Sequence, residues 1–430
     1  MTYQETCEWL FCKTANFEHQ GQTGYKASLD NMLRLDDHYG HPHRDFKCIH
    51  VTGTNGKGSV SHTLAAILQS GGYKVGLYTS PHVLDFSERI RINGAPINQD
   101  YVVRFVEEGR KQFETIGCTF FEIATAMAFK YFSDEQIDIA VVEVGLGGRL
   151  DSTNIITPVL SVITNVSLEH TQILGKTVEQ IAFEKGGIIK DGVPVVIGET
   201  SPESRHVFES LAQQRHATIR FAEDEQEILS ATLMADCSVI SYETAHWGTF
   251  NGELYGNYQI KNTRTILCAA DVLVGLGIVK RQKKVAKEAF AHVSELTGLM
   301  ARWQTVSTSP TVICDIGHNI AAWENLGKQL AALKGGKLHI VFGMVSDKDV
   351  NGVLALAPKN ATYYFTQPST HRALPVERLQ EAASLSGLSG DCYETVEEAF
   401  AAAQKAARKS DFIFVGGSNY VVADFLKKGV

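Results

Sequence analysis

HVTGTNGKGSVSHTLAAIL, from His50 to Leu68, places a glycine-rich loop between two apolar patterns of different period. Residues 46–51 indicate a short buried strand, whereas apolar residues recur at helical spacing after the loop. A loop between a strand and a helix directs backbone N–H groups and the positive end of the helix at one point, and Lys57 adds a full charge there. We therefore predict a phosphate-binding loop made of Gly53, Thr54, Asn55, Gly56, Lys57, Gly58 and Ser59.

The spacing of this loop departs from the common phosphate-loop pattern G-x-x-x-x-G-K-[ST]. The residue five before Gly56 is Val51, and Gly58 separates the lysine from the hydroxyl of Ser59. A glycine-rich turn with a solvent-facing lysine is the alternative interpretation. The order of strand, loop, lysine, hydroxyl and helix favours the phosphate site.

Length and composition bound the class of protein. A chain of 430 residues is too long for one ordinary core and indicates two or three domains. Lysine and arginine number 40 against 48 acidic residues, a net charge of −8, so we expect neither nucleic acid nor an anionic membrane as partner. The eight cysteines are scattered without a C-x-x-C pair, which is typical of a reducing compartment. With no signal-peptide pattern at MTYQETCEWL and no long apolar segment, we expect a cytoplasmic protein.

The rest of the chain repeats an apolar strand followed by polar or glycine residues. GGYKVGLYTSPH completes a βαβ unit, QIDIAVVEVGLGG and TPVLSVITNVSLEH predict buried parallel strands, and TVICDIGHN, KLHIVFGMVSDKD and DFIFVGGSNYVVADFL predict a second set. Residues 221–262 predict a small antiparallel region, and a helix is predicted over 280–295. We therefore predict an α/β fold, with a P-loop ATPase-like parallel-sheet domain over residues 1–296 that includes the antiparallel region, and a Rossmann-like α/β domain over residues 297–430.

Polar residues follow several predicted strands of the first domain. Ser80 follows the strand ending near Thr79, Glu143 ends an apolar run, and His170 comes just after the strand ending at Thr164. Ligands of open parallel sheets bind at the carboxyl ends of the strands, and Mg²⁺ prefers oxygen ligands. These three residues are candidate magnesium ligands, although each alone could serve as a cap, a turn or a structural histidine.

Other charged residues are harder to interpret from pattern. Lys185 lies near the end of a predicted helix, where a lysine commonly complements the helix dipole, and pattern alone favours that role. Asp315 and His318 lie at the end of a strand in the second domain. Arg302, at the crossing between the domains, could reach a polyphosphate, but without a motif a surface arginine in a linker is the preferred interpretation.

The combination of GTNGKGS, YTSPH, EVGLGGRLDSTN, SLEHTQILG, EKGGIIK, GNYQIKN and DIGHN, in this order, resembles the folylpolyglutamate synthase and dihydrofolate synthase branch of the Mur ligase family. The resemblance covers residues 46–319 by motif and the remainder more by fold. It implies ATP-dependent amide formation, in which ATP phosphorylates a folate carboxylate to an acyl phosphate and the amine of L-glutamate attacks it. Positioning and charge neutralisation do most of this work.

The resemblance also implies roles for individual residues of the first domain. Lys57 and the loop amides would hold the β- and γ-phosphates of ATP. Ser80, Glu143 and His170 match the magnesium ligands of the family, for which two metal sites are expected. Lys185 matches a lysine that is carbamylated in this family, so that a cation becomes an anion able to steady the second magnesium and the acyl phosphate.

Further roles follow from the same resemblance. Asn262, Arg302 and Asp315 match nucleotide-binding positions, the last two reaching across a cleft that domain closure would complete. His318 matches a histidine near the glutamate and phosphate groups. The candidate contacts for a folate pterin and its tail are His82, Phe86, Arg89, Phe120, Phe121 and Glu122. Core packing is an equally good interpretation of the phenylalanines.

The sequence departs from the family pattern at two places. Ile320 follows Asn319 where the family commonly has proline, which could loosen the start of the next helix. MARWQ keeps Arg302 but lacks the glycine that usually precedes it. The geometry of the second domain is therefore less well specified by motif than the chemistry of the first.

Three interpretations of function remain open from sequence. The first is a folate ligase that uses folate or dihydropteroate, L-glutamate and ATP, and works as a monomer. GGRLDSTN is similar to bifunctional bacterial forms, in which Asp151 would lie near the pteroate. The second is a peptidoglycan-precursor amide ligase of the same superfamily, and the third is a P-loop regulatory ATPase that ligates nothing.

Overall fold

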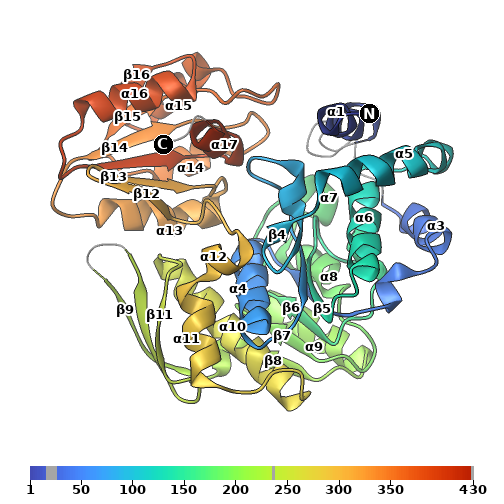
Figure 1. Cartoon of the computed structure of the whole chain (residues 1–430). Coiled ribbons are helices and arrows are strands. Elements are labelled where there is room, and N and C mark those ends of the chain that lie inside the picture. Colours follow the sequence, from blue (N-terminus) through green and yellow to red (C-terminus); the bar gives the residue numbers. More distant parts are fainter. Residues whose placement is uncertain (16–26, 235–237, 428–430) are drawn as a thin grey trace. The chain divides into compact units, whose positions relative to one another are not determined.

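The computed structural model describes residues 1–15, 27–234 and 238–427. Its chain forms two compact units (Figure 1). The first consists of Met1–Thr232, Ser241–Glu253 and Gln259–Leu299, and the second of Leu233–Ile240, Leu254–Tyr258 and Met300–Val430. The predicted domain boundary between residues 296 and 297 stays a prediction.

An eight-stranded sheet forms the centre of the first unit, in the order β4-β3-β2-β5-β1-β6-β7-β8. All neighbours from β2 to β8 pair in parallel, whereas β3 pairs antiparallel with both β2 and β4. The strands are β1 (Lys47–Thr52), β2 (Val75–Tyr78), β3 (Ile90–Ile92), β4 (Ala95–Pro96), β5 (Ile139–Glu143), β6 (Leu160–Ile163), β7 (Val195–Ile197) and β8 (Ile219–Phe221).

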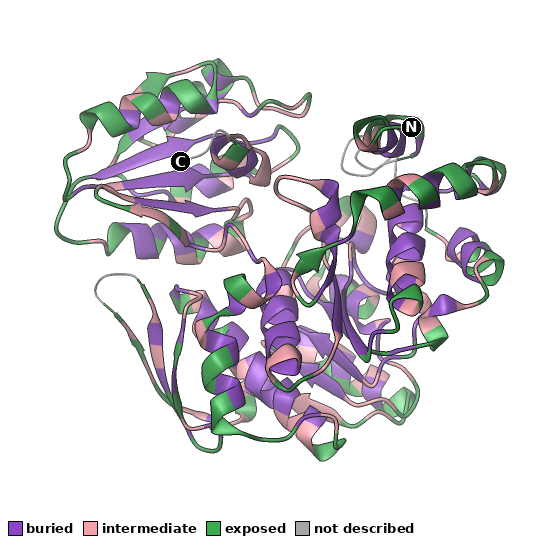
Figure 2. Cartoon of the chain, viewed as in Figure 1, coloured by how far each residue is buried: buried purple, intermediate pink, exposed green. Residues whose placement is uncertain are grey.

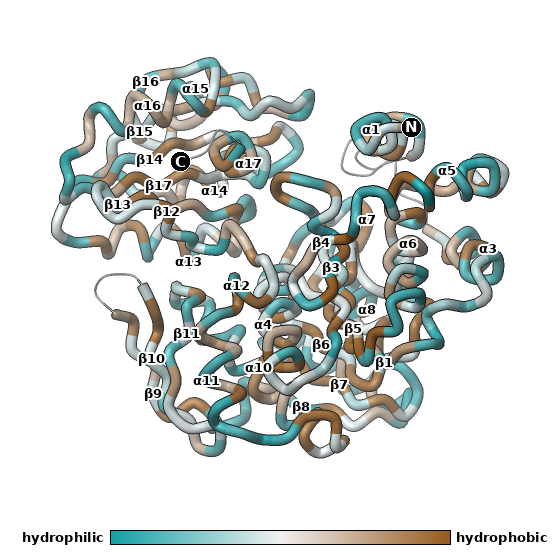
Figure 3. The backbone as a smooth tube through the Cα atoms, in the orientation of Figure 1, coloured by the Kyte–Doolittle hydropathy of each residue, from teal (hydrophilic) through white to brown (hydrophobic). Residues whose placement is uncertain are grey.

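Except for the edge strand β8, the parallel strands are buried along almost their whole length, as an internal sheet with covered faces requires (Figure 2). Their apolar composition appears as brown segments along strands such as β1 and β5 in Figure 3. The helices of this unit are α1 (Tyr3–Lys13), α3 (Asp30–His38), α4 (Lys57–Ser70), α5 (Gln99–Ile116), α6 (Phe120–Asp134), α7 (Thr171–Leu174), α8 (Val178–Gly186), α9 (Pro202–Gln214), α10 (Asn257–Gly275), α11 (Lys283–Ala291) and α12 (Val293–Thr297). Short 3₁₀ turns occur at Pro42–Arg44, Phe86–Arg89, Ser152–Ile155 and Ala222–Asp224.

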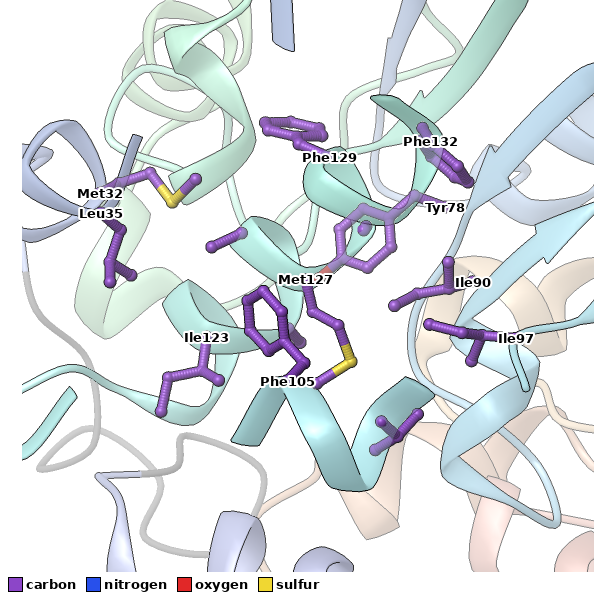
Figure 4. Close-up of a cluster of buried hydrophobic side chains, with 14 of the residues drawn as sticks. Met32, Leu35, Tyr78, Ile90, Ile97, Phe105, Ile123, Met127, Phe129 and Phe132 are labelled. Atoms are coloured by element: carbon purple, nitrogen blue, oxygen red, sulfur yellow. The ribbon is translucent and has the colours of Figure 1, made fainter. Parts of the chain in front are cut away.

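Aromatic and aliphatic side chains from α6, α5, α3 and the adjoining strands form one large core cluster. In Figure 4, Met127 of α6 lies between Phe105 of α5 and Tyr78 of β2. These side chains are fully or nearly fully buried. Burial of each such side chain contributes about 1.5–3 kcal/mol, so the cluster fixes α5 and α6 on this side of the sheet.

The predicted helix over 280–295 is divided in two at His292, whose φ of −134° and ψ of 34° are not helical. The carbonyl of Phe290, which would accept from the Ser294 N–H in a continuous helix, instead accepts from the Glu253 N–H at 3.0 Å. The Ser294 N–H donates to the Glu253 carboxylate. A tertiary contact therefore replaces one helical hydrogen bond, and it explains why α11 and α12 are separate.

The region predicted as small and antiparallel contains a separate three-stranded sheet in the order β11-β10-β9. Its strands are β9 (Ile228–Leu233), β10 (Ile240–Thr244) and β11 (Thr249–Gly252). The Thr244 side chain holds the turn between β10 and β11, because its Oγ1 donates to the Gly248 carbonyl at 2.7 Å and accepts from the Trp247 N–H at 3.1 Å.

A six-stranded sheet in the order β12-β13-β17-β14-β15-β16 forms the second unit. Among its described strands, β12 and β13 pair antiparallel and the other neighbours pair in parallel. The strands are β12 (Gln304–Thr308), β13 (Thr311–Asp315), β14 (Leu338–Phe342), β15 (Thr362–Phe365), β16 (Gly390–Cys392) and β17 (Phe412–Gly416), and the helices are α13 (Ile320–Ala331), α14 (Val350–Leu356), α15 (Val376–Leu385), α16 (Val396–Ala406) and α17 (Asn419–Lys427). Together with the first unit, this alternation of strands and helices confirms the predicted α/β fold and the Rossmann-like character of the C-terminal part.

The seven cysteines in the described part of the chain are free thiols, and Cys237 lies outside the described residues. Within the described ranges, no helix combines the length and the apolar character that a bilayer crossing needs.

Candidate functional site

The candidate site lies at one edge of the first sheet. Strands β2, β5, β1 and β6 are consecutive neighbours and run parallel, so their carboxyl ends meet at this edge. The segments that leave these ends carry Ser80, Glu143, the 53–59 loop and His170. The topology thus places the residues predicted from separate motifs on adjacent strands.

The 53–59 loop has the backbone geometry that its glycines allow. Gly56, with φ of 86°, is the N-cap residue of α4, and Lys57 is the first residue of the helix. A Cβ atom at Gly53 would lie 1.8 Å from Oγ1 of Thr164, on the segment after β6. The loop therefore passes against its neighbour at a distance that only glycine permits.

The segment after β6 holds the loop through its backbone. The Thr54 N–H donates to the Asn165 carbonyl at 3.0 Å, and the Asn55 N–H donates to Oδ1 of Asn165 at 3.0 Å. Oγ1 of Thr164 donates to the Asn55 carbonyl at 2.5 Å. Sequence reasoning missed Thr164 and Asn165, although they lie at the end of a predicted strand, at the same edge as the other candidates.

Lys57 folds back over its own loop. Its Nζ donates to the Gly53 carbonyl at 3.0 Å and to the Thr54 carbonyl at 3.1 Å. The ammonium group therefore lies over the loop, close to the start of α4, where a phosphate group would be attracted by the charge and the helix N-terminus together.

Helix α10 joins the loop from another side. Nε2 of Gln259 donates to Oγ of Ser59 at 3.2 Å, and Nδ2 of Asn262 donates to Oε1 of Gln259 at 2.8 Å. A Cβ atom at Gly56 would lie 2.4 Å from Oδ1 of Asn262. The structure thus brings Asn262 to the loop, and Gln259 links the two. Sequence reasoning missed Gln259, and its position in the GNYQIKN motif was the only signal that could have indicated this role.

We predict that Gly53→Ala lowers the affinity for ADP by about 10- to 100-fold, because the added methyl group would displace the loop from Thr164. Isothermal titration calorimetry would measure the dissociation constant. Gly275→Ala at the end of α10 is the matched control, because a Cβ atom there meets nothing within 4 Å and alanine favours the helix. An unchanged ADP affinity in Gly53→Ala would contradict the prediction.

The candidate metal ligands are partly assembled. The Ser80 N–H donates to Oε2 of Glu143 at 3.1 Å, and Glu143, the last residue of β5, is buried. His170 has a left-handed backbone, with φ of 48°, and its Nε2 lies 3.6 Å from the carboxylate of Glu169. The structure brings Ser80 and Glu143 into contact. It places His170 on the segment that follows β6, at the same carboxyl edge of the sheet.

The donor chemistry of this edge fits a hard divalent cation. Among the described residues no three His, Cys, Asp or Glu side chains gather as metal ligands. Mg²⁺ binds proteins through one or two carboxylates and completes its shell with phosphate and water oxygens. One buried carboxylate and a neighbouring serine beside a phosphate loop therefore suit Mg²⁺ better than a metal that needs an all-protein cage.

Lys185 is buried near the end of α8, with 3% of its surface exposed. Burial, together with the positive charge of Lys57, lowers the pKa of Lys185 to about 7, and Glu169 opposes the shift. An amine with this pKa is substantially neutral at physiological pH, so a plain helix-dipole role does not describe it. Lys57, Lys185 and Glu169 are therefore close enough to interact electrostatically.

Asp151 is buried in the loop that follows β5, where it precedes the 3₁₀ turn Ser152–Ile155. Its Oδ2 accepts from the Leu146 N–H at 2.8 Å, and its Oδ1 accepts from the Thr153 N–H at 3.0 Å. Burial raises the pKa of Asp151 while these hydrogen bonds oppose the rise. The carboxylate thus holds its own loop, and its predicted place near a pteroate stays a prediction.

Four of the six predicted folate contacts form one cluster. Nε of Arg89 donates to Nδ1 of His82 at 2.8 Å, and the guanidinium lies 5.0 Å from the ring centroid of Phe120. Phe86 and Phe120 contact each other at 5.9 Å between centroids and both belong to the core cluster. These two phenylalanines therefore pack in the core, as one of the two interpretations expected. Their contact with folate stays a prediction.

The other two predicted folate contacts differ in character. Phe121 is half-buried and lies beside Gly145, where a Cβ atom would meet its ring at 2.4 Å. Glu122 is buried, and its Oε2 accepts from the Thr119 N–H at 2.7 Å and from Nδ2 of Asn31 at 3.0 Å. Glu122 thus completes the capping box of α6, a structural role that its spacing from Thr119 could have indicated.

Asp315 of the second unit accepts hydrogen bonds from two backbone N–H groups and one hydroxyl. Its carboxylate accepts from the Trp303 N–H at 2.8 Å, the Gly317 N–H at 2.8 Å and the Tyr258 hydroxyl at 3.1 Å. Burial raises the pKa of Asp315, and the charge of Arg302 opposes this. Arg302 and Asp315 are therefore neighbours, and their contact with nucleotide stays a prediction.

The departures from the family pattern have local explanations. Oδ1 of Asn319 accepts from the Ala322 N–H at 2.8 Å, so α13 has a side-chain cap although Ile320 replaces the usual proline. Ala301, which replaces the usual glycine, has φ of 58°, a left-handed conformation that glycine adopts more easily. Nδ1 of His318 contacts the Ile316 carbonyl at 3.0 Å, which places the ring in the loop after β13.

Comparison with known proteins agrees with this arrangement. The Mur ligase middle domain matches residues 51–270, and the Mur ligase glutamate ligase domain matches residues 301–419. The dihydrofolate synthase/folylpolyglutamate synthase of Bacillus subtilis (strain 168) is 30% identical over 99% of this chain and 99% of its own length. The folylpolyglutamate synthase of Lacticaseibacillus casei is 33% identical over 87% of this chain and 88% of its own length.

Solved structures are similar over the full chain. The Escherichia coli protein FolC in complex with DHPP and ADP has a TM-score of 0.84 and 29% identity, covering 100% of this chain and 97% of its own. The bifunctional folylpolyglutamate synthase/dihydrofolate synthase of Yersinia pestis, complexed with AMPPNP and a Mn ion, has a TM-score of 0.82 and 28% identity, covering 100% of this chain and 98% of its own. These structures contain a nucleotide, and the second also contains a divalent metal.

The two matched domains, one with a glycine-rich loop at the carboxyl edge of its parallel sheet and one Rossmann-like, place the chain among the Mur-type ligases. Within that class, the chain belongs to the folylpolyglutamate synthase/dihydrofolate synthase branch of the Mur ligase family. The resemblance found from the motifs is thereby confirmed. The peptidoglycan-precursor ligase and the regulatory ATPase find no support in these relatives.

Proposed function

We propose that the chain joins L-glutamate to the glutamate tail of a reduced folate with ATP, and that it also forms dihydrofolate from dihydropteroate and L-glutamate. The carrying observation is the assembly of the 53–59 loop, Glu143 and the segment after β6 on adjacent parallel strands. Full-length similarity to the ligases named above supports the substrates. The bifunctional form is favoured by the relatives whose names carry both activities.

The chemistry consists of two displacements. A carboxylate oxygen of the folate substrate attacks the γ-phosphorus of ATP, and the bond to the bridging oxygen breaks so that ADP leaves. The amine nitrogen of glutamate then attacks the acyl carbon of this acyl phosphate, loses a proton, and expels inorganic phosphate. Neither step requires a covalent bond to the protein, so the chain acts by positioning and by neutralising charge.

Lys57 and the backbone N–H groups of the loop are proposed to hold the β- and γ-phosphates, and Asn262 to contact the nucleotide beside Gly56. Ser80, Glu143 and His170 are proposed to hold Mg²⁺, at two sites in all, and such a cation neutralises phosphate charge when bound. In the second unit, Arg302 and Asp315 are proposed to bind nucleotide and His318 to lie near glutamate and phosphate.

Lys185 is proposed to be carbamylated. The neutral amine attacks CO₂, a C–N bond forms and one proton is released, which leaves an anionic carbamate. Burial and a pKa of about 7 support this, because a neutral amine is the reacting form. The carbamate places an anion next to Lys57, where the protonated form of Lys185 would repel that lysine.

Product analysis by mass spectrometry tests the function. Separate reactions contain ATP, Mg²⁺, L-glutamate and either dihydropteroate or tetrahydrofolate, with glutamate omitted as control. We expect one added glutamate in both reactions and ADP formation that requires both the pterin substrate and glutamate. Product from tetrahydrofolate alone would remove the dihydrofolate synthase activity, and ADP formation without any glutamate addition would overturn the ligase.

The remaining expectations concern the surroundings of the enzyme. We propose that it works as a monomer in the cytoplasm on small-molecule substrates, without nucleic acid or membrane as partner. Its net charge of −8 supports the absence of a general polyanion-binding surface.

A further inference from the structure

Three buried polar side chains form a hydrogen-bonded chain beneath the candidate site. His50 lies on β1, two residues before the strand ends, and Thr153 and Asp151 lie on the loop that follows β5. Nε2 of His50 is 2.8 Å from Oγ1 of Thr153, and Oγ1 of Thr153 is 2.5 Å from Oδ1 of Asp151. His50 and Thr153 have no exposed surface at all.

The direction of each hydrogen bond follows from the chemistry. Thr153 has a single hydroxyl hydrogen, which it donates to the Asp151 carboxylate. Oγ1 of Thr153 must therefore accept from His50, so the imidazole carries its hydrogen on Nε2. Burial lowers the pKa of His50 to about 3, so the ring is neutral and one tautomer is fixed.

Asp151 connects this hydrogen-bonded chain to the backbone of the loop. Its two oxygens accept from the N–H groups of Leu146 and Thr153 as well as from the Thr153 hydroxyl. A second tie to β1 comes from Thr52, whose Oγ1 donates to the Gly147 carbonyl at 2.6 Å. Residues 145–154 are thus fixed to the strand that leads into the phosphate loop.

The same loop packs on the last turn of α8, from which Lys185 projects. The Arg149 N–H donates to the Glu184 carbonyl at 2.7 Å. A Cβ atom at Gly148 would lie 2.9 Å from the carbonyl oxygens of both Glu184 and Lys185. The loop backbone therefore touches the backbone of Lys185 at a distance that excludes any side chain.

A side-chain amide closes the contact from the other direction. Nδ2 of Asn154 donates to the carbonyls of Arg149 and Gly187, both at 3.0 Å. The 145–154 loop and the end of α8 are consequently joined at residues 148–149 and again at residue 187. A shift of the loop would move the backbone that carries Lys185.

We propose that His50, Thr153 and Asp151 are positioning residues that fix the place of the Lys185 side chain, by holding the 145–154 loop against the end of α8. The proposal rests on the proposed function for its consequence in catalysis. It assigns the Asp151 carboxylate to the scaffold of the site, because loop donors engage both of its oxygens. The chain thereby links β1, which supports Lys57, to the helix that supports Lys185.

The variants that test the proposal remove one bond at a time. His50→Leu and Thr153→Val abolish the donor and the hydroxyl, whereas His50→Gln keeps an N–H near the position of Nε2 and Thr153→Ser keeps the hydroxyl. Thr244→Val is the matched control, because Thr244 is also buried and its hydroxyl also holds a turn, in the separate three-stranded sheet. A calorimetric titration with ADP confirms that each variant is folded and binds nucleotide.

Two readouts are needed. Hydrogen–deuterium exchange, measured without substrates on peptides covering residues 144–155 and 183–190, reports on the contact between loop and helix. Steady-state kinetics of glutamate addition reports kcat and the KM for ATP separately. Because the exchange measurement needs no turnover, a wild-type enzyme that ligates nothing would refute the proposed function while still leaving the contact tested.

We expect His50→Leu and Thr153→Val to exchange faster in both peptides and to lower kcat by about 10- to 100-fold, with the KM for ATP changed less than about threefold. His50→Gln and Thr153→Ser should restore kcat to within about fivefold of the wild type. Thr244→Val should change neither readout. The proposal is overturned if Thr153→Val keeps its kcat, if kcat falls without faster exchange in the 183–190 peptide, or if His50→Gln fails as completely as His50→Leu.

Discussion

Replacing Lys57 by methionine is expected to lower kcat for glutamate addition by about 100- to 1,000-fold. Lys57 is the charged group of the loop, and its Nζ lies over the carbonyls of Gly53 and Thr54 at the start of α4. A preorganised donor aimed at developing charge typically contributes an effect of this size. Methionine keeps the length of the side chain, so the loss would report on charge and not on packing.

The same variant has a second, independent consequence. Burial comes first and the charge of Lys57 second among the causes that lower the pKa of Lys185. Lys57→Met should therefore raise the pKa of Lys185 above its value of about 7. The ¹³C NMR signal of a carbamate, followed against pH in ¹³C-bicarbonate, would measure this shift, and an unchanged midpoint would contradict the interaction of the two lysines.

Replacing Lys185 by methionine is expected to abolish activity and to stabilise the protein at the same time. Loss of the side chain that carries the proposed carbamate should lower kcat by at least about 100-fold. The free energy of unfolding should rise by about 1 to 4 kcal/mol at pH 6, because an apolar side chain of similar volume replaces a buried charge. Urea denaturation in CO₂-free buffer, without nucleotide or metal, would measure the change.

The pH dependence of this gain follows from the direction of the pKa shift. The pKa of Lys185 is about 7 in the folded protein against 10.5 for an ordinary lysine. Below pH 7 the lysine is protonated in both the folded and the unfolded protein, so the cost of burying its charge lowers the free energy of unfolding by the largest amount. Above pH 7 the unfolded state binds more protons than the folded state, so the free energy of unfolding of the wild type rises with pH.

The advantage of Lys185→Met should therefore be largest below pH 7 and shrink towards pH 10. Lys185→Arg is the informative companion, because it keeps a buried charge that neither loses its proton nor forms a carbamate; it should lose activity without gaining stability. Lys130→Met, which removes a partly exposed lysine paired with Asp134, should change the free energy of unfolding by less than about 0.5 kcal/mol. A loss of stability in Lys185→Met at pH 6 would contradict the burial argument.

The first domain could be predicted well because its signals are local. The strand before the loop and the apolar helical spacing after it appear as β1 and α4, and Glu143 ends β5 as expected. Parallel pairing then brings the ends of separate strands to one edge, which is a general property of such sheets. The sequence therefore contained enough to bring Ser80, Glu143 and the loop together.

What could not be predicted depends on contacts between distant residues. The break at His292 arises because Glu253 takes up the carbonyl of Phe290, which no periodicity in residues 280–295 reveals. Pattern alone gave Lys185 a helix-dipole role, since burial and the proximity of Lys57 exist only in the folded chain. Glu122 shows the opposite case, because the spacing Thr119 to Glu122 is a local capping signal that the folate interpretation overlooked.

The second unit is not one continuous stretch of chain. Residues 254–258 belong to it although more than forty residues of the first unit follow them, and their Tyr258 supplies one of the three donors to the Asp315 carboxylate. Tyr255 of the same stretch lies 6.2 Å from Trp303 between ring centroids. A fragment expressed from residue 297 onward would lack both aromatic residues and leave Asp315 short of a partner. The C-terminal part therefore cannot be separated by a single cut in the chain without losing residues that belong to it. A gene fusion or a split protein would have to include residues 254–258 together with the C-terminal part.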